Sequence, residues 1–190
     1  MKPLLLASAL SVMAIAPFAQ AADYVIDTEG AHAFIQFRVS HLGYSYVEGR
    51  FNTFTGSFSY DANKLTESKI ELTIDTTSVD SNHAARDKHL RSADFLNVDK
   101  HAKANFVSTK IVPKTADTFD VVGNFTFNGV TKEITIAATK VGEGKDPWGG
   151  YRAGFTGTSA INLTDFGIKN VLGPKAETVA LSFVVEGIRK

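Results

Sequence analysis

The fold of this chain is decided by residues 119–136, which read FDVVGNFTFNGVTKEITI. On both sides of Asn128-Gly129, apolar side chains recur at alternate positions, in the period-two pattern of strands that bury one face. Asn-Gly between two such runs is a strong short-range signal for a two-residue hairpin turn, because both residue types accept positive φ angles. The stretch therefore predicts two antiparallel strands joined by a tight turn.

The same alternation recurs through the rest of the chain and predicts about eight strands. The phase of the pattern slips between Phe51 and Phe54, which indicates a bulge or bend near Asn52-Thr53. Gly142–Pro147 reads as a loop between two strands. An all-β domain of this kind closes as a barrel or packs as a sandwich. The alternating runs are residues 33–39, 54–60, 70–74, 104–111, 119–127, 134–138, 151–161 and 179–185.

One stretch departs from the strand pattern and predicts a short helical excursion. Ser81–Ser92 contains helix formers, with Ser81 as the expected N-cap. Asp87 and Arg91 are spaced i, i+4 and, with Arg86, are expected to be solvated or to form a local ion network. A single helix between strands is interpreted as a lid or end cap of the β domain.

The first residues have the organisation of a secretory signal peptide. Met1-Lys2-Pro3 is a short basic start, Leu4–Ala16 is an uninterrupted run of apolar and small residues, and Ala19-Gln20-Ala21 matches a small-residue cleavage site. The apolar run is shorter than the roughly 20 residues that span a bilayer. We therefore expect residues 1–21 to be removed and the mature domain to comprise residues 22–190, without stable insertion in a membrane.

Composition excludes several classes of function. The chain has 190 residues, with 20 basic and 20 acidic side chains and no cysteine. A net charge of zero lacks the basic footprint of a nucleic-acid-binding protein, so no nucleic-acid partner is expected. The lack of cysteine excludes disulfides, thiolate zinc sites, iron–sulfur clusters and a cysteine nucleophile.

The residues of the alternating faces leave the nature of the barrel interior open. Large rings such as Phe125 and Phe155 share their faces with small residues such as Gly123 and Ala153. Large and small side chains can interdigitate and fill a small barrel. They can equally leave an apolar tunnel whose bore Gly123 and Ala153 would keep open, because eight strands is the size at which a barrel holds one ligand.

The search for catalytic chemistry finds little. The chain has no G-x-S-x-G, no P-loop and no H-E-x-x-H motif. His83, His89 and His101 are interleaved with aspartates, but His83 and His89 are six residues apart, which is a poor spacing for two ligands on one helix face. Ser40-His41 would need a distant acid to form a triad. We expect a polar cap region with no functional metal and no cofactor.

A series of motifs in chain order resembles the YceI-like family of exported polyisoprenoid-binding proteins. The resemblance spans essentially the whole of residues 22–190, and the RDKHLRSADF block is its most specific part. One departure is Asn124–Phe127, where the family often has an acidic residue followed by Leu-Thr-Ile. The motifs are Asp27-x-x-x-x-His32, Ile35-x-Phe37-x-Val39-x-His41-Leu42-Gly43, Gly49-Arg50-Phe51, Arg86–Phe95, Phe106–Thr109, Gly123–Thr131 and Asp165–Ile168.

The resemblance implies an elongated, lipocalin-like antiparallel barrel in the periplasm, whose apolar tunnel holds a long isoprenoid chain such as a quinone or polyprenyl tail. Sequestration or transport of this lipid is the implied role, and no catalytic activity follows from it. The candidate mouth residues, which would meet the lipid head group, are His41, Arg86 and His89. The candidate tunnel residues are Phe37, Val39, Phe51, Phe125, Ala153, Phe155 and Phe183.

Two other functions stay open at this point. One is an enzyme that acts on the isoprenoid head group at the barrel mouth near His83 and His89. The other is a barrel filled by its own side chains, which acts through its surface. Oligomeric state is not determined by the sequence, and a homodimer is compatible with it.

The predicted processing can be tested by mass. We expect the exported protein to begin at Ala22, because residues 1–21 carry no strand pattern and have the composition of a targeting segment. Intact-mass measurement of the exported protein checks this. A mass that includes the apolar N-terminal segment would instead support a membrane anchor.

Overall fold

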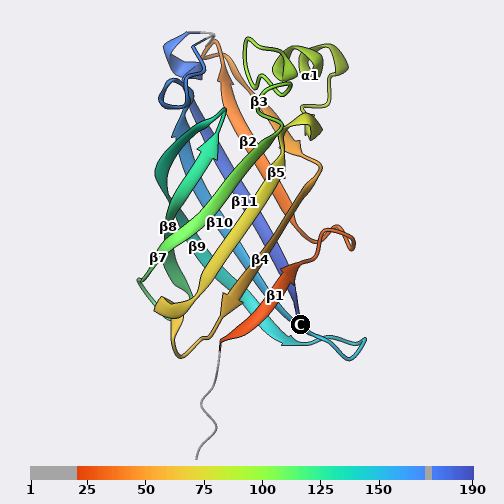
Figure 1. Cartoon of the computed structure of the whole chain (residues 1–190), viewed down its shortest axis with the longest axis vertical. Helices are drawn as coiled ribbons and strands as arrows, with labels where there is room; N and C mark the ends of the chain where they lie inside the picture. The colour runs from red at the N-terminus through yellow and green to blue at the C-terminus, as the bar shows by residue number, and fades with distance from the viewer. Residues whose placement is uncertain (1–20, 170–172) are drawn as a thin grey trace, which may run out of the picture.

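The chain folds into a long antiparallel β-barrel with one helix at its upper end (Figure 1). This computed structural model describes residues 21–169 and 173–190, which contain eleven strands, one α-helix and four short 3-10 helices. The predicted signal peptide lies, apart from Ala21, outside the described residues. The helix is α1 (Ala84–Arg91), and the 3-10 helices are η1 (Leu65–Glu67), η2 (Thr76–Ser78), η3 (Leu163–Phe166) and η4 (Pro174–Ala176).

The strands are longest in the C-terminal half of the chain, where they make most of the barrel wall. None of the helices in the described part of the chain has both the length and the apolar character that crossing a membrane requires. The strands are β1 (Ala22–Ile26), β2 (Phe34–His41), β3 (Ser45–Phe51), β4 (Phe54–Tyr60), β5 (Lys69–Asp75), β6 (Val79–Asp80), β7 (Lys103–Pro113), β8 (Thr118–Phe127), β9 (Val130–Lys145), β10 (Tyr151–Asn162) and β11 (Thr178–Arg189).

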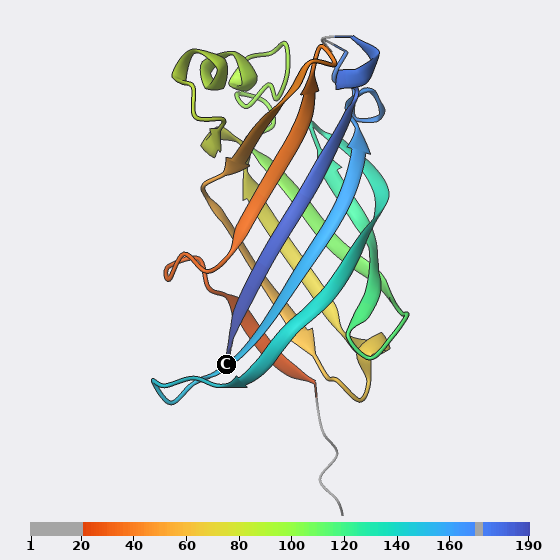
Figure 2. The ribbon, with the colours of Figure 1, turned by 180° about the vertical axis from the view of Figure 1, so that it is seen from behind.

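Eight strands close the barrel in the order β1-β4-β5-β7-β8-β9-β10-β11, and β11 pairs back onto β1. All pairings are antiparallel. β11 has two partners on one side: its first half, Val179–Val184, pairs with β2, and its end, Gly187–Arg189, pairs with β1. The wall therefore continues towards the helix end through β2, β3 and β6, as the view from behind shows (Figure 2). This confirms the all-β barrel and selects it over a sandwich.

Local turn chemistry behaves as predicted in two places. Asn128 and Gly129 adopt φ angles of 48° and 75° and join β8 to β9 with Phe127 opposite Val130. The bend near Asn52-Thr53 separates β3 from β4. There the Asn52 amide donates to the Ser78 carbonyl oxygen (3.1 Å), so the chain bonds to a different segment at the point where its strand partners change.

The predicted loop at Gly142–Pro147 was placed wrongly. β9 continues to Lys145, because Gly142 and Gly144 pair with residues of β10 and their backbone groups are satisfied across the strands. The turn lies at residues 146–150, where the Asp146 carboxylate accepts hydrogen bonds from the amides of Trp148 (3.0 Å) and Gly150 (2.7 Å).

The helix is present, but its N-cap differs from the prediction, and Asp87 and Arg91 have separate partners. The residue that caps α1 is His83, whose Nδ1 accepts from the Arg86 amide (3.2 Å). Ser81 is buried instead, and its amide and hydroxyl donate to the Asp87 carboxylate at 2.8 and 2.5 Å. Arg91 donates to the Val79 carbonyl oxygen (3.3 Å) rather than pairing with Asp87. Arg91 thus attaches the helix to β6, and Asp87 attaches it to Ser81, the residue after β6.

A cluster around Arg152 holds together the outer wall where β1 meets β11. The Arg152 guanidinium donates to Asp27 (2.7 Å), Glu186 (2.6 Å) and Asp146 (2.9 Å). The hydrogen bond from Arg152, followed by one from the Gly30 amide, holds the pKa of the buried Asp27 carboxyl below its ordinary value. One cation therefore connects the β1–β2 loop, the β9–β10 turn and β11.

This cluster predicts a pH-dependent contribution to stability. Because the pKa of Asp27 is lowered by folding, its contribution is complete above the unfolded pKa of about 3.9 and is lost as pH falls through the folded value. We expect Asp27→Asn to lower the free energy of unfolding by about 2 kcal/mol at pH 7. The difference from the wild type should shrink at pH 3, as measured by urea unfolding at both pH values.

Asp23→Asn is the matched control, since Asp23 is an exposed carboxylate on β1, the strand that leads into Asp27. Its effect should be small at both pH values. An Asp27→Asn deficit that is equally large at pH 3 would contradict the ionic origin of the contribution.

Candidate functional site

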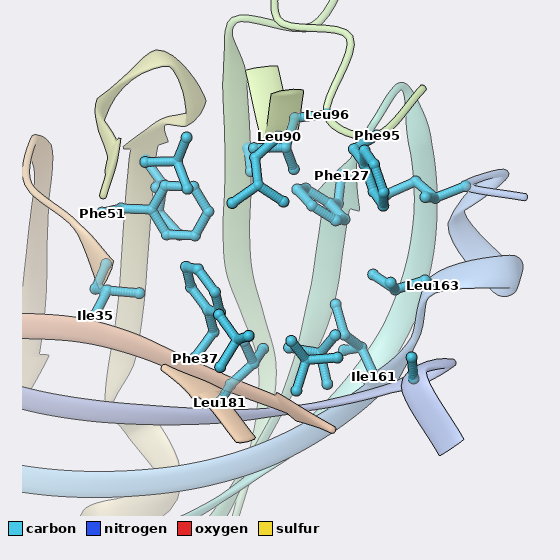
Figure 3. Close-up of a pocket in the computed structure, with 18 of the residues that line it drawn as sticks. Ile35, Phe37, Phe51, Leu90, Phe95, Leu96, Phe127, Ile161, Leu163 and Leu181 are labelled. Carbon is cyan, nitrogen blue, oxygen red and sulfur yellow. The ribbon is translucent and has the colours of Figure 1, made fainter. Parts of the chain in front are cut away.

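The barrel contains an apolar cavity of about 520 Å³ beneath α1, here called the upper cavity (Figure 3). Its lining comprises 30 residues, of which 25 are apolar. The five polar residues are Ser40, His41, His83, Arg86 and His89, which come from the end of β2 and from α1 and the residue before it. The polar groups therefore all lie at the helix end, where exposed residues mark the opening of the cavity.

Side chains point alternately into and out of the barrel along each strand, and this alternation determines which residues line the cavity. On β2, Ile35, Phe37 and Val39 all line the cavity, while the residues between them face outward. Glycine makes room for large rings at two positions. A Cβ atom on Gly49 would lie 2.3 Å from Phe37 Cζ, and one on Gly123 would lie 2.5 Å from Phe106 Cζ. The expectation that Gly123 keeps the bore open is therefore corrected, because the Phe106 ring occupies that space.

A second cavity of about 90 Å³, here called the lower cavity, lies nearer the other end of the barrel. Four side chains line both cavities and form the neck between them: Leu72, Phe106, Ile136 and Phe183. The two cavities therefore lie next to each other inside the barrel, on either side of these four side chains.

Aromatic rings form the floor of the lower cavity. Phe155 makes edge contacts with Phe58, Tyr60 and Phe119, with centroid separations of 5.5, 5.1 and 6.0 Å. All four residues line the lower cavity. These rings, here called the Phe155 cluster, leave the lower part of the barrel filled while the upper part is hollow.

The structure places six of the seven candidate tunnel residues at a cavity. Phe37, Val39, Phe51, Phe125 and Phe183 line the upper cavity, Phe183 also lines the lower one, and Phe155 lines the lower one alone. Ala153 is fully buried but lines neither cavity; it pairs with Glu143 and Gly187 in the wall. That these residues touch a ligand stays a prediction.

The three candidate mouth residues are brought together at the upper cavity, and two of them also have structural partners. Arg86 donates to the backbone oxygen of Ser81 (2.6 Å) and to its hydroxyl (2.7 Å). His89 Nε2 lies 3.3 Å from a carboxylate oxygen of Asp94. His41 is exposed at the end of β2. The mouth thus combines anchored polar groups with an imidazole at the rim.

Sequence reasoning missed the part of the lining that comes from outside the strands. Leu90, Phe95 and Leu96 cover the cavity from the helix side, and Leu163 and Ile168 cover it from the segment around η3. The region 81–101 was interpreted as a polar cap because its histidines and aspartates dominate the sequence. The spaced apolar residues between those charges were the available signal.

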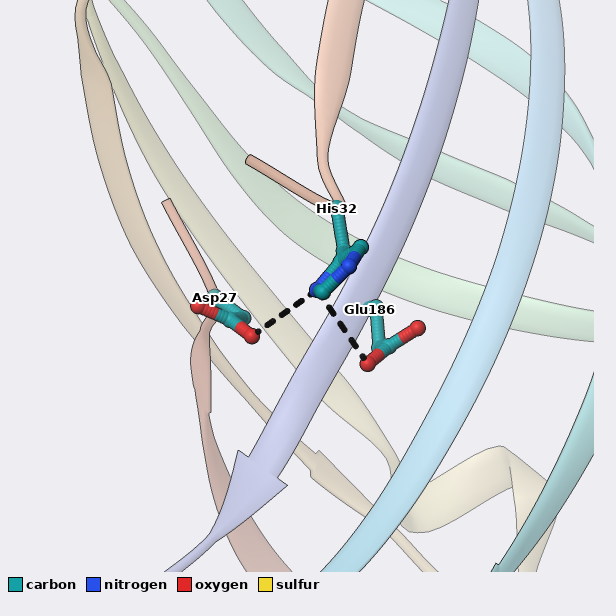
Figure 4. Close-up of side chains that lie close together, drawn as sticks. All are labelled: Asp27, His32 and Glu186. Atoms are coloured by element: carbon teal, nitrogen blue, oxygen red, sulfur yellow. Dashed lines mark hydrogen bonds and ion pairs between the residues drawn. The ribbon is translucent and has the colours of Figure 1, made fainter. Parts of the chain in front are cut away.

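A cluster of titratable side chains lies away from the histidines near α1. Among the described residues, the cluster with metal-ligand geometry is Asp27, His32 and Glu186, on the outer wall (Figure 4). His32 Nδ1 lies 3.4 Å from Asp27 Oδ2 and 3.9 Å from Glu186 Oε1. The same two oxygens accept hydrogen bonds from Arg152, so a cationic side chain already occupies the position of a metal ion. We interpret the cluster as structural.

The fold and the cavity define a class of protein: a closed antiparallel β-barrel with an apolar interior that opens at one end. Residues 24–187 match the model of the YceI-like domain, and the chain belongs to this family. The UPF0312 protein of Shewanella baltica strain OS185 is 60% identical over 191 residues, which cover 100% of both chains.

Solved structures support the same assignment. The YceI protein of Campylobacter jejuni has 26% sequence identity and a TM-score of 0.72, covering 80% of this chain and 90% of that one. A structure described as a polyisoprenoid binding domain from Saccharophagus degradans, implicated in plant cell wall breakdown, has a TM-score of 0.67 at 17% identity. It covers 90% of this chain and 100% of the other. At that identity the likeness concerns the fold.

Proposed function

We propose that this protein is a periplasmic lipid-binding protein that holds one linear polyisoprenoid chain, such as a quinone or polyprenyl tail, for sequestration or transport. The observation that carries the proposal is the upper cavity, whose lining is apolar except at its open end. Such a distribution fits a ligand with a long hydrocarbon body and a polar head. The head would lie beside His41, Arg86 and His89, and the tail would extend through the neck towards Phe155.

Apolar contact alone can supply the affinity. Burial of each CH₂ group is worth about 0.8 kcal/mol, so a chain of several isoprene units can bind tightly without directed hydrogen bonds. The Saccharophagus degradans structure, which shares the fold and is described as polyisoprenoid-binding, supports this class of ligand. The YceI-like family assignment supports it as well.

Periplasmic location is part of the proposal: export rests on residues 1–21, and the periplasm as the destination rests on the YceI-like family. Their basic start, apolar run and Ala-x-Ala end are those of a cleaved secretory signal. We propose that the functional unit is the barrel domain of residues 22–190.

The geometry favours binding over catalysis. An enzyme acting on the head group would use His83 or His89 at the mouth. His83 Nδ1 instead accepts the capping hydrogen bond from Arg86, and His89 contacts Asp94. We therefore propose that the mouth histidines hold α1 in place and contribute polarity. A barrel filled by its own side chains fits poorly with a cavity of about 520 Å³.

Two neighbouring residues of β11 provide a direct test of the cavity. Leu181 lines the upper cavity, whereas the next residue, Ser182, is exposed on the outer face. We expect Leu181→Trp to abolish most lipid loading, because the larger side chain occupies the ligand's space, at a stability cost of about 1–3 kcal/mol or less. Ser182→Trp should retain wild-type loading. Organic extraction and mass spectrometry measure the lipid, and thermal unfolding monitors the fold.

Each outcome of this extraction separates the candidate functions. A stoichiometric isoprenoid that is lost only in Leu181→Trp supports the proposal. A chemically converted lipid would support the enzyme instead. Wild-type protein that carries no lipid after export would contradict the proposed function.

The Phe155 cluster predicts a limit on ligand length. Phe155→Ala removes the central ring of the floor, which should extend the path and shift the bound chains to greater length, at a cost of about 3 kcal/mol in stability. The measurement is mass spectrometry of chains captured from a mixture of polyprenols of graded length.

Phe34→Ala serves as the control, because Phe34 is an exposed ring on the outside of β2. This variant should capture the wild-type distribution of lengths. An unchanged distribution in Phe155→Ala would show that the floor does not limit the ligand.

A further inference from the structure

The turn between β2 and β3, together with the start of β3, carries a concentration of exposed apolar side chains. Leu42, Tyr44 and Tyr46 are 52%, 88% and 64% exposed and lie within five consecutive residues. We call these three residues the apolar tip. The other large apolar side chains exposed on the described residues are spread over several elements: Val25, Phe34, Val107, Val141, Trp148 and Ile188.

The apolar tip is held in a defined conformation. Leu42 has a φ angle of 54°, in the left-handed region that a bulky residue rarely adopts. The Tyr44 amide donates to the His41 carbonyl oxygen (3.0 Å), and the Gly43 amide donates to Ser40 Oγ (3.2 Å). Leu42 keeps this unfavourable conformation although 52% of its surface stays exposed, and backbone strain of this kind is typical of functional positions.

The tip stands at the opening of the upper cavity. His41, the residue directly before Leu42, lines that cavity, and the β2–β3 turn lies at the same end of the barrel as α1 (Figure 1). A molecule that enters or leaves the barrel at this end passes beside the tip. The place of the tip thus connects it with ligand exchange.

The charged side chain that lies directly against the turn of the tip is positive. Residues 39–47 contain no acidic side chain. Lys175 lies against the turn, since a Cβ atom on Gly43 would be 2.9 Å from its Cδ and 3.1 Å from its Nζ. The Arg38 guanidinium lies 4.8 Å from the centre of the Tyr46 ring but is paired with Glu48 (2.6 Å), so Lys175 supplies the positive charge at the tip. Tyrosine rings, an apolar side chain and a nearby ammonium group together match the interface of a bilayer that contains anionic phospholipid.

We propose that the apolar tip docks the barrel mouth onto a phospholipid bilayer. Leu42 and Tyr44 enter the interfacial layer, while Lys175 faces the lipid phosphates. The open end of the cavity then faces the membrane, so that an apolar chain passes between bilayer and barrel with little exposure to water. This role in exchange rests on the proposed function, whereas the docking itself does not need an isoprenoid.

The test uses the exported protein and vesicles of phosphatidylethanolamine and phosphatidylglycerol that contain no isoprenoid. Leu42→Asn combined with Tyr44→Ser removes the apolar surface and retains a residue that tolerates positive φ. We expect at least a tenfold loss of vesicle binding in a flotation assay. Trp148→Ser is the matched control, since Trp148 is 78% exposed on the β9–β10 turn at the other end of the barrel. It should stay within twofold of the wild type.

Several results would overturn the docking proposal. One is vesicle binding by the tip variant that equals that of the wild type. Another is a loss of vesicle binding in Trp148→Ser as large as in the tip variant. A third is a tip variant that no longer self-associates but binds vesicles unchanged. The last result would identify the tip as a contact between two copies of the chain. Thermal unfolding confirms that each variant is folded before it is compared.

Extraction of the same samples keeps the two proposals distinguishable. Tip-dependent vesicle binding by a protein that yields no extracted lipid would support docking and contradict the isoprenoid-binding function. If the protein carries lipid but the tip variant binds vesicles as well as the wild type does, docking is contradicted and the isoprenoid-binding function is still supported.

Discussion

The pairing of β1 with β11 is the interaction on which the barrel depends, because it converts an open sheet into a closed wall. The pairing joins only three residue pairs, from Tyr24 opposite Arg189 to Ile26 opposite Gly187. The Tyr24 and Phe58 rings stack inside this seam with a centroid separation of 4.8 Å. Gly187 permits that arrangement, since a Cβ atom there would lie 2.4 Å from the Phe58 ring. The Arg152 cluster secures the same region from outside, and it lowers the pKa of the Asp27 carboxyl.

Closure places one face of every barrel strand inside, where the residues of this chain are mostly apolar, but it does not decide between a filled interior and a hollow one. At the seam end, the rings of Tyr24, Phe58, Tyr60, Phe119 and Phe155 fill the barrel. At the helix end, aliphatic residues such as Val39, Val179 and Leu181 line a cavity together with phenylalanine rings. The two ends follow the same alternating pattern. Their difference comes from side-chain volume around a closed wall, which brings together residues far apart in the chain.

This explains which features the sequence predicts and which it does not. The β8–β9 hairpin was predictable because Asn128-Gly129 determines its turn locally. The inward placement of Phe37, Phe125 and Phe183 followed from alternation. The role of Arg152 was not predictable, because its partner Asp27 lies 125 residues away. Gly123 was misread for the same reason, since the ring that occupies its space belongs to Phe106 on the neighbouring strand.

The distribution of polar groups at the mouth bears on how such a barrel selects its ligand. Arg86 is bonded to Ser81, His83 caps α1, and His89 contacts Asp94, so these side chains have partners within the protein. A head group that bonded to them would have to displace those contacts or share them. Recognition by a precise set of hydrogen bonds is therefore disfavoured at the mouth. The barrel would instead select its ligand by the shape and length of the ligand's apolar chain, because the neck and the Phe155 cluster limit the space along the barrel.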